Sequence, residues 1–133
     1  MDDKFKKYIE HLEFLGCKNT IDEENQNWAD VDHPIQDFQL YMGNNHSLYH
    51  RVAFNTKKKL PTKKTDEIIR FMNYFNKESI ISSSFLSENI CICGVNYSGE
   101  YSKTSYGAFI EYFLKDSNDW TRDILEKFDD VIL

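Results

Sequence analysis

The sequence predicts an α+β fold in which helices flank an antiparallel sheet, with the element order α-β-β-β-α-β-β-α. Apolar residues recur every three or four positions in segments 3–16, 66–77 and 105–131, which is the periodicity of amphipathic helices. Between these segments, apolar and polar residues alternate in runs that end in short polar turns, as in antiparallel hairpins. Strands grouped between helices favour an antiparallel α+β arrangement over a doubly wound parallel sheet.

The composition is that of one folded acidic domain. A chain of 133 residues suffices for a single domain, and its 15% aromatic content is too high for a disordered chain, which lacks the apolar area to offset chain entropy. The formal net charge of -6 makes nucleic acid and anionic membranes poor partners. We therefore expect a globular domain that binds no nucleic acid.

The three cysteines and the N-terminus suggest a reducing compartment. Cys91 and Cys93 are two residues apart, so on a strand they would point the same way at roughly 6.6 Å, which suits neither a disulfide nor a secreted scaffold. We expect them, with Cys17, to be free. The first residues contain no apolar signal segment, and no apolar run approaches the ~20 residues of a membrane span. The expected location is the cytoplasm, without membrane insertion.

The first half of the chain predicts one helix and a hairpin. In segment 3–16, Phe5, Tyr8, Ile9, Leu12 and Leu15 share a helical face, and Gly16 is placed to end the helix. The polar segment 18–30 predicts a loop that ends in a short strand around Trp28. Alternating residues in 37–42 and 48–54 predict a hairpin, joined by a turn at 43–46 whose residues tolerate positive φ.

The second half predicts a helix, a second strand pair and a closing helix. Segment 57–64 holds five lysines and reads as a solvated basic loop, with contact to an acidic partner as the alternative. Thr65 is the expected N-cap of helix 66–77, whose apolar face carries Ile68, Ile69, Met72 and Phe75. Segments 80–86 and 90–97 predict strands joined by 87–89. In 105–131 the pattern leaves open whether Ser117-Asn118 divides the helix in two.

The residue types that carry chemistry are not arranged in a recognisable catalytic or metal-binding motif. The histidines at 11, 33, 46 and 50 lie outside metal-ligand spacings, so we expect them to be solvated or half-buried. Asp129 and Asp130 fall on the exposed side of the last helix, where solvation is the simpler interpretation. The sequence contains no glycine-rich phosphate motif. We expect no catalytic residue, no metal and no cofactor.

Four aromatic residues fall outside the main apolar stripes of their helices. They are Phe71, Tyr74, Tyr106 and Tyr112. Exposed apolar patches of this kind usually mark a protein interface. The alternative is that these residues belong to the core of a thick α+β domain.

The second half of the chain resembles a known bacterial family. Helix 66–77 ends in Phe-Met-Asn-Tyr-Phe-Asn, which places Asn73 and Asn76 in an N-x-x-N pair, and two strands and a long helix follow. Over about residues 65–131 this pattern resembles the YbjN family of putative sensory transduction regulators, and the element order of the whole chain resembles the type III secretion chaperone fold. The resemblance implies a non-enzymatic, often dimeric protein that binds other proteins.

These observations predict a small acidic protein-binding module, like a secretion chaperone or a YbjN-like regulator. Its expected partners are another protein and a second copy of itself. The homodimer would bury Phe71 and Tyr74, or an edge strand. Two alternatives from other classes stay open: an immunity or antitoxin-type inhibitor, and an enzyme without a recognisable motif.

Overall fold

The computed structural model describes residues 1–43 and 45–133, and there it has an α+β fold with one six-stranded antiparallel sheet. The strand order across the sheet is β1-β2-β3-β4-β6-β5. The elements in chain order are α1 (Asp3–Phe14), β1 (Lys18–Ile21), β2 (Trp28–Asp32), β3 (Phe38–Met42), β4 (Leu48–Asn55), α2 (Thr62–Glu78), β5 (Ser83–Ser87), β6 (Ile90–Tyr97) and α3 (Lys103–Phe128). The predicted α+β class is confirmed, and the described part of the chain has four strands rather than three before α2.

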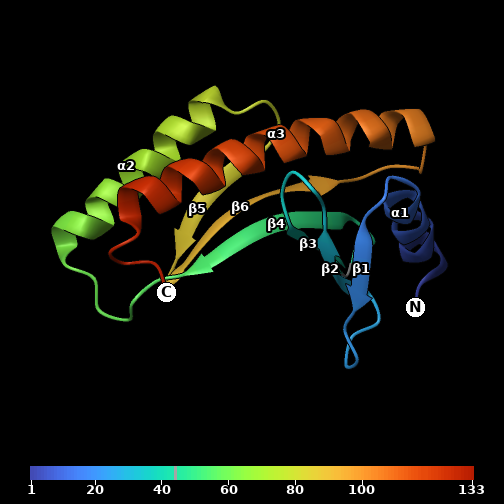
Figure 1. The fold of residues 1–133 in the computed structure, drawn as a ribbon, viewed down its shortest axis with the longest axis horizontal. Helices are drawn as coiled ribbons and strands as arrows, with labels where there is room; N and C mark the ends of the chain where they lie inside the picture. Colours follow the sequence, from blue (N-terminus) through green and yellow to red (C-terminus); the bar gives the residue numbers. More distant parts are fainter. Residues whose placement is uncertain (44) are drawn as a thin grey trace.

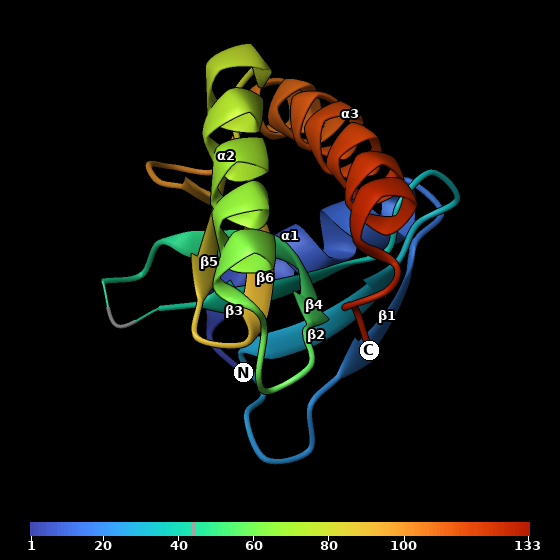
Figure 2. The same ribbon diagram turned by 90° about the vertical axis from the view of Figure 1, so that its left-hand side faces the viewer.

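The helices gather on one face of the sheet. Helices α2 and α3 lie side by side over β4, β5 and β6, while α1 lies near β1 at the opposite end (Figures 1 and 2). Helix α1 begins where the Asp2 carboxylate accepts a hydrogen bond from the Lys4 amide at 2.8 Å. It ends before Gly16, whose φ of +89° favours glycine, as the sequence predicts. The predicted helix 3–16 is therefore confirmed, with an end two residues earlier than predicted.

The predicted loop at 18–30 is wrong over its first residues. Residues 18–21 form the edge strand β1, which pairs with β2 in the register Thr20 opposite Asp30. Segment Lys18–Ile21 holds one apolar residue, so its sequence lacks the alternation of a half-buried strand. Its strand conformation depends on pairing with β2, which a local pattern does not reveal.

The central hairpin matches the prediction. Strands β3 and β4 pair with Leu40 opposite His50, and the alternate residues of both strands are buried. The turn between them includes His46 with φ of +62°, consistent with the expected positive φ. Asn44, which belongs to the predicted turn, lies outside the described residues.

Helix α2 begins earlier than the sequence indicates. Pro61 precedes its first residue, and the Thr65 amide donates to the Pro61 carbonyl at 3.0 Å, so Thr65 lies inside the helix and is not its N-cap. Proline is favoured at helix starts because its fixed φ is helical and it has no amide hydrogen. Lys64 pairs with Asp130 at 3.1 Å. The basic segment 57–64 is thus a loop only up to Pro61, because its last three residues belong to α2. Lys64 and Asp130, which were expected to be solvated, form an ion pair with each other.

Helix α3 is continuous and anchors the segment before β5. The carboxylate of Asp116 accepts hydrogen bonds from the amides of Ile80, Ile81 and Ser82 at 2.8–2.9 Å, so these residues do not join the strand predicted for 80–86. The Ser117 hydroxyl donates to the Phe113 carbonyl at 2.7 Å inside the helix. Ser117-Asn118 therefore does not divide α3.

The core lies between the sheet and the helices as one cluster of buried apolar residues. Trp120 of α3 is fully buried and stacks on Phe54 of β4 with ring centroids 5.8 Å apart. Cys17, Cys91 and Cys93 are buried and free, as predicted. Among the described residues, no helix combines the length and apolar character needed to cross a membrane.

Candidate protein-binding site

The structure separates the four predicted interface residues into two groups. Tyr106 is fully buried and Phe71 is only 8% exposed, so both are core residues and the alternative interpretation holds for them. Tyr106 packs against Tyr8 of α1 at 4.6 Å, and Phe71 packs against Phe128 of α3 at 5.7 Å between ring centroids. A second helix covers each ring, which explains why it lies outside the main stripe of its own helix.

Tyr74 and Tyr112 are exposed, but the structure does not bring them into one site. They are 64% and 49% exposed. Tyr74 lines a cleft of about 160 Å³ between α2 and α3, together with Phe71 and Phe75. Tyr112 lies on α3 outside the lining of that cleft. The predicted patch of four aromatic residues is therefore not one surface.

Of the N-x-x-N pair, Asn76 has a structural role. Its side-chain amide donates to the Ser84 carbonyl at 3.0 Å, and its carbonyl oxygen accepts from the Ser84 amide at 2.6 Å. Ser84 lies on the edge strand β5, so Asn76 occupies the backbone groups that a further strand would bind. Asn73 is exposed on α2.

Two histidines are more buried than the sequence indicates. His50 is fully buried, and its Nε2 lies 2.7 Å from the Tyr106 hydroxyl. Burial lowers the pKa of His50 from 6.5 to about 3. His11 is 6% exposed, and both burial and the nearby Lys103 ammonium lower its pKa. Both side chains are neutral at pH 7 and contribute to the core, which corrects the expectation of solvated or half-buried histidines.

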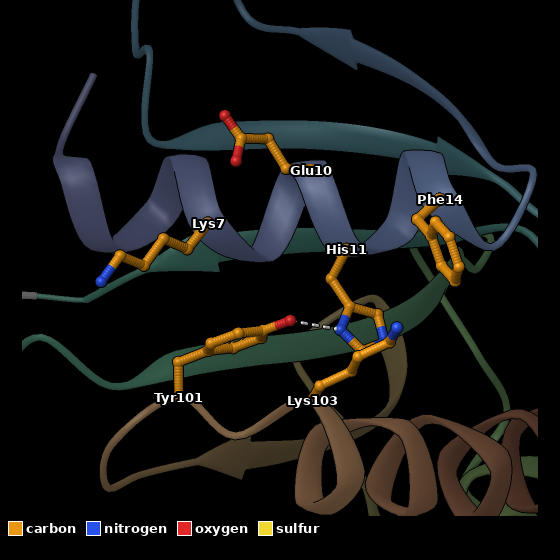
Figure 3. Close-up of a pocket in the computed structure, with 6 residues that line it drawn as sticks. All are labelled: Lys7, Glu10, His11, Phe14, Tyr101 and Lys103. Atoms are coloured by element: carbon orange, nitrogen blue, oxygen red, sulfur yellow. Dashed lines mark hydrogen bonds between the residues drawn. The ribbon is translucent and has the colours of Figure 1, made fainter.

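A pocket of about 450 Å³, lined by charged and aromatic residues, lies between α1 and the start of α3. Figure 3 shows His11 and Tyr101 facing each other across it, with their Nδ1 and hydroxyl oxygen 2.7 Å apart. Glu10 points away from this pair in the same view. The ammonium of Lys103 lies 4.5 Å from the centre of the Phe14 ring. The His11–Tyr101 bond joins α1 to the segment before α3, so the pair holds the fold together at this end.

A larger groove runs along α3. Its floor is formed by Ile110 and Leu114 of α3, which are buried, and it measures about 640 Å³. Leu15, just after α1, and Ile35, between β2 and β3, also line it and are 42% and 58% exposed. Pockets of roughly 300–1,000 Å³ are typical of ligand sites. We call this feature, with Leu15, Ile35, Ile110 and Leu114, the α3 groove.

The charged residues at the α3 groove leave one carboxylate available. Lys115 pairs with Asp119 at 3.2 Å, whereas Glu111 makes no ion pair with any described residue. Burial lowers the pKa of His33, and its Nδ1 accepts a hydrogen bond from the Ile35 amide at 3.0 Å. His33 is therefore neutral at pH 7, and the groove is apolar with a single uncompensated negative charge.

The sequence did not identify Leu15 and Ile35 as candidate site residues. Leu15 continues the apolar stripe of α1, but α1 ends at Phe14 and the side chain is left outside the core. Ile35 follows Pro34 in a short connection, where an apolar residue carries no periodic signal. The available clue was Ile35, an apolar residue in a connection that also contains His33, Gln36 and Asp37.

Searches of known family models, of curated proteins and of solved structures found no match for this chain. Within the described residues, no group of three or more histidine, cysteine, aspartate or glutamate side chains is arranged to hold a metal ion. The assignment of a site therefore depends on the geometry of the surface.

Proposed function

We propose that this chain is a small acidic, non-enzymatic protein-binding module, acting as a secretion-chaperone-like or YbjN-like regulator. The α3 groove is the surface that holds its partner. The observation that carries the proposal is the convergence of Leu15 and Ile35, two exposed aliphatic side chains from separate connections, over the apolar floor of α3. Exposed apolar side chains gathered at one groove favour burial against another protein.

The occupant is a short segment of another protein with apolar side chains and one lysine or arginine. Apolar side chains match the floor of Ile110 and Leu114. The basic residue matches Glu111, whose carboxylate is not neutralised by a described partner. Because the whole chain carries a net charge of -6, a basic segment is also attracted from a distance.

A photo-crosslinking amino acid at Ile35 tests this assignment in the native cell. Ile69 of α2 is the matched control, because it is an isoleucine with a comparable exposure, 43% against 58%. We expect one discrete adduct from position 35 and none from position 69. The substitution Leu15→Asp, on the opposite connection, should reduce that adduct because it places a charge in the groove.

Binding by the purified partner completes the test. We expect saturable one-to-one binding that Leu15→Asp weakens at least tenfold, since truncating or charging an interface anchor often has an effect of ~2 kcal/mol. The mass of the partner should stay unchanged during incubation, because a binding module does not convert its partner into a product. Equal adducts at both positions, or conversion of excess partner into product by a trace of this chain, would contradict the proposal.

A further inference from the structure

One face of the sheet is turned away from the helices, and we call it the open face. The strand registers determine which side chains lie on it. Along each strand, alternate side chains turn toward the helices, as Phe38 does in packing against Phe113 at 5.2 Å between ring centroids. Their neighbours along the strand point the other way. In the described part of the chain all three helices pack on the first face, so the open face carries no helix of its own.

An aromatic row crosses the open face on three adjacent strands. Trp28 lies opposite Tyr41, and Tyr41 lies opposite Tyr49. The first two rings stack with centroids 4.4 Å apart and an interplanar angle of 6°, and the second pair is 5.4 Å apart. The Tyr49 side chain continues the row over Gly94 of β6, where a Cβ would meet its ring. The rings form a continuous, half-buried layer.

A polar row runs beside the aromatic row on the same three strands. Asp30 lies opposite Gln39, and Gln39 lies opposite Arg51. The Gln39 amide donates to the Asp30 carboxylate at 3.2 Å, and the Arg51 Nε donates to the Gln39 carbonyl oxygen at 2.7 Å. The polar row thus has the neutral Gln39 at its centre, with the negative Asp30 on one side and the positive Arg51 on the other.

We propose that the open face is the contact surface between two copies of this chain. A two-fold axis parallel to β3, lying between two facing sheets, superposes β3 on β3 and reverses the order of the other strands. Asp30 of one copy then faces Arg51 of the other, twice. Trp28 faces Tyr49, also twice. Both rows are self-complementary about the same axis, a property that an unrelated partner would not require.

The charge of the open face also favours a second copy as its occupant. Four charged side chains point this way, Lys18, Asp30, Asp32 and Arg51, and their charges cancel. The rest of the chain carries the whole net charge of -6, so other faces repel a second copy. In a single copy the Arg51 guanidinium lies over the Trp28 ring, with Cζ 5.0 Å from its centre. In the dimer a change of rotamer, which exchanges its bond to Gln39, brings it to Asp30 of the second copy.

The size of the open face sets the strength of the dimer. Because the axis lies on β3, strand β5 has no strand of the second copy opposite it. The other five strands at ~4.8 Å, with about five residues each at ~3.3 Å, give roughly 400 Å² per copy. The total of about 800 Å² is the size of a weak, transient interface. The dimer therefore forms reversibly with rising concentration. Pairing through the β5 edge is disfavoured, because Asn76 already binds both backbone groups of Ser84.

Charge reversal at the two ends of the polar row tests the proposal. Arg51→Glu places two acidic groups opposite each other in a homodimer, and Asp30→Arg places two basic groups opposite each other. We expect each variant to dimerise at least tenfold more weakly than the wild type. An equimolar mixture of the two variants should form a heterodimer, because each contact then joins opposite charges. Arg70→Glu and Asp129→Arg make the same charge changes at exposed positions elsewhere and are the controls.

Light scattering behind a sizing column, from about 10 to about 300 µM, measures the outcome in a range suited to a small interface. The wild type and the controls should approach twice the 15.8 kDa chain mass. A wild type that stays monomeric, or a mixture that associates no better than either variant alone, would overturn the proposal. Crosslinking to the partner at Ile35 would be unaffected, so this failure is distinct from failure of the proposed function.

A cysteine on the axis provides a second measurement if either charge variant does not fold. Gln39→Cys lies opposite its own copy in the proposed dimer. Facing sheets pack ~10 Å apart, which is too far for a direct disulfide, so a short bismaleimide should link the two thiols into a covalent dimer. Asn73→Cys on exposed α2 is the control and should stay monomeric under the same conditions. The native cysteines are buried and do not compete. Equal crosslinking at both positions would contradict the proposed axis.

Discussion

Acidification should destabilise this protein through His50 in a way that can be isolated from every other titrating group. His50 is fully buried among the rings of Phe38, Phe109 and Phe113, and its Nε2 lies 2.7 Å from the Tyr106 hydroxyl. Its Nδ1 is buried without a hydrogen-bond partner. Burial lowers its pKa from 6.5 to about 3 in the folded state.

The sign and size of the effect follow from the two pKa values of His50. Between pH 6.5 and about 3 the unfolded chain binds a proton that the folded chain does not, so stability falls as the pH falls. Each pH unit in that window removes ~1.36 kcal/mol, so the loss between pH 7 and pH 4 is about 3 kcal/mol. That is a large share of the ~5–15 kcal/mol of a typical domain.

Denaturant unfolding of the wild type and of His50→Gln at pH 7, 6, 5 and 4 measures this contribution. The variant is less stable overall, but it lacks the titrating group, so its free energy of unfolding should fall by about 3 kcal/mol less over this range. Contributions from carboxylates and from His11 are common to both proteins and cancel. Parallel pH profiles for the wild type and His50→Gln would refute the reasoning.

Three further predictions concern packing and the sheet edge. Trp120→Ala should lower the free energy of unfolding by ~3–5 kcal/mol, measured by denaturant titration, because the side chain is fully buried; an unchanged midpoint would contradict its place in the core. Gly94→Ala should destabilise the fold, because a Cβ would lie 2.8 Å from a backbone carbonyl oxygen of β4. Gly107→Ala has open space around it and should stabilise α3 by ~0.5–1 kcal/mol. Thermal melts that rank the two variants in the opposite order would contradict this packing. Asn76→Ala should uncover the β5 edge and lower stability by ~1–3 kcal/mol, with aggregation followed by light scattering, and Asn73→Ala should match the wild type.

The sequence predicted the elements whose stability is encoded locally. Helix α1 and the β3–β4 hairpin follow from apolar periodicity and from a turn that tolerates positive φ. The early start of α2 was missed because Thr65 is a better N-cap by residue type than Pro61, which makes no side-chain capping bond. Strand β1 was missed because its conformation depends on pairing with β2 rather than on its own pattern.

The candidate site was less predictable, because contacts between distant segments decide which apolar residues are exposed. Tyr106 and Phe71 fall outside the stripes that face the sheet, yet α1 and α3 cover them. Leu15 belongs to an apolar stripe but lies beyond the end of its helix. The α3 groove joins a helix end, a loop and α3, which are separated by up to a hundred residues, so no local pattern could show it.

Amide hydrogen exchange of the complex with the purified partner shows whether the α3 groove holds a segment of another protein. We expect slower exchange in residues 33–37 and 107–118, which border the groove, and unchanged exchange in residues 62–78 of α2. The Leu15→Asp variant should lose that protection at the same concentrations. Protection confined to α2 or to the open face, with the groove segments unchanged, would contradict the claim.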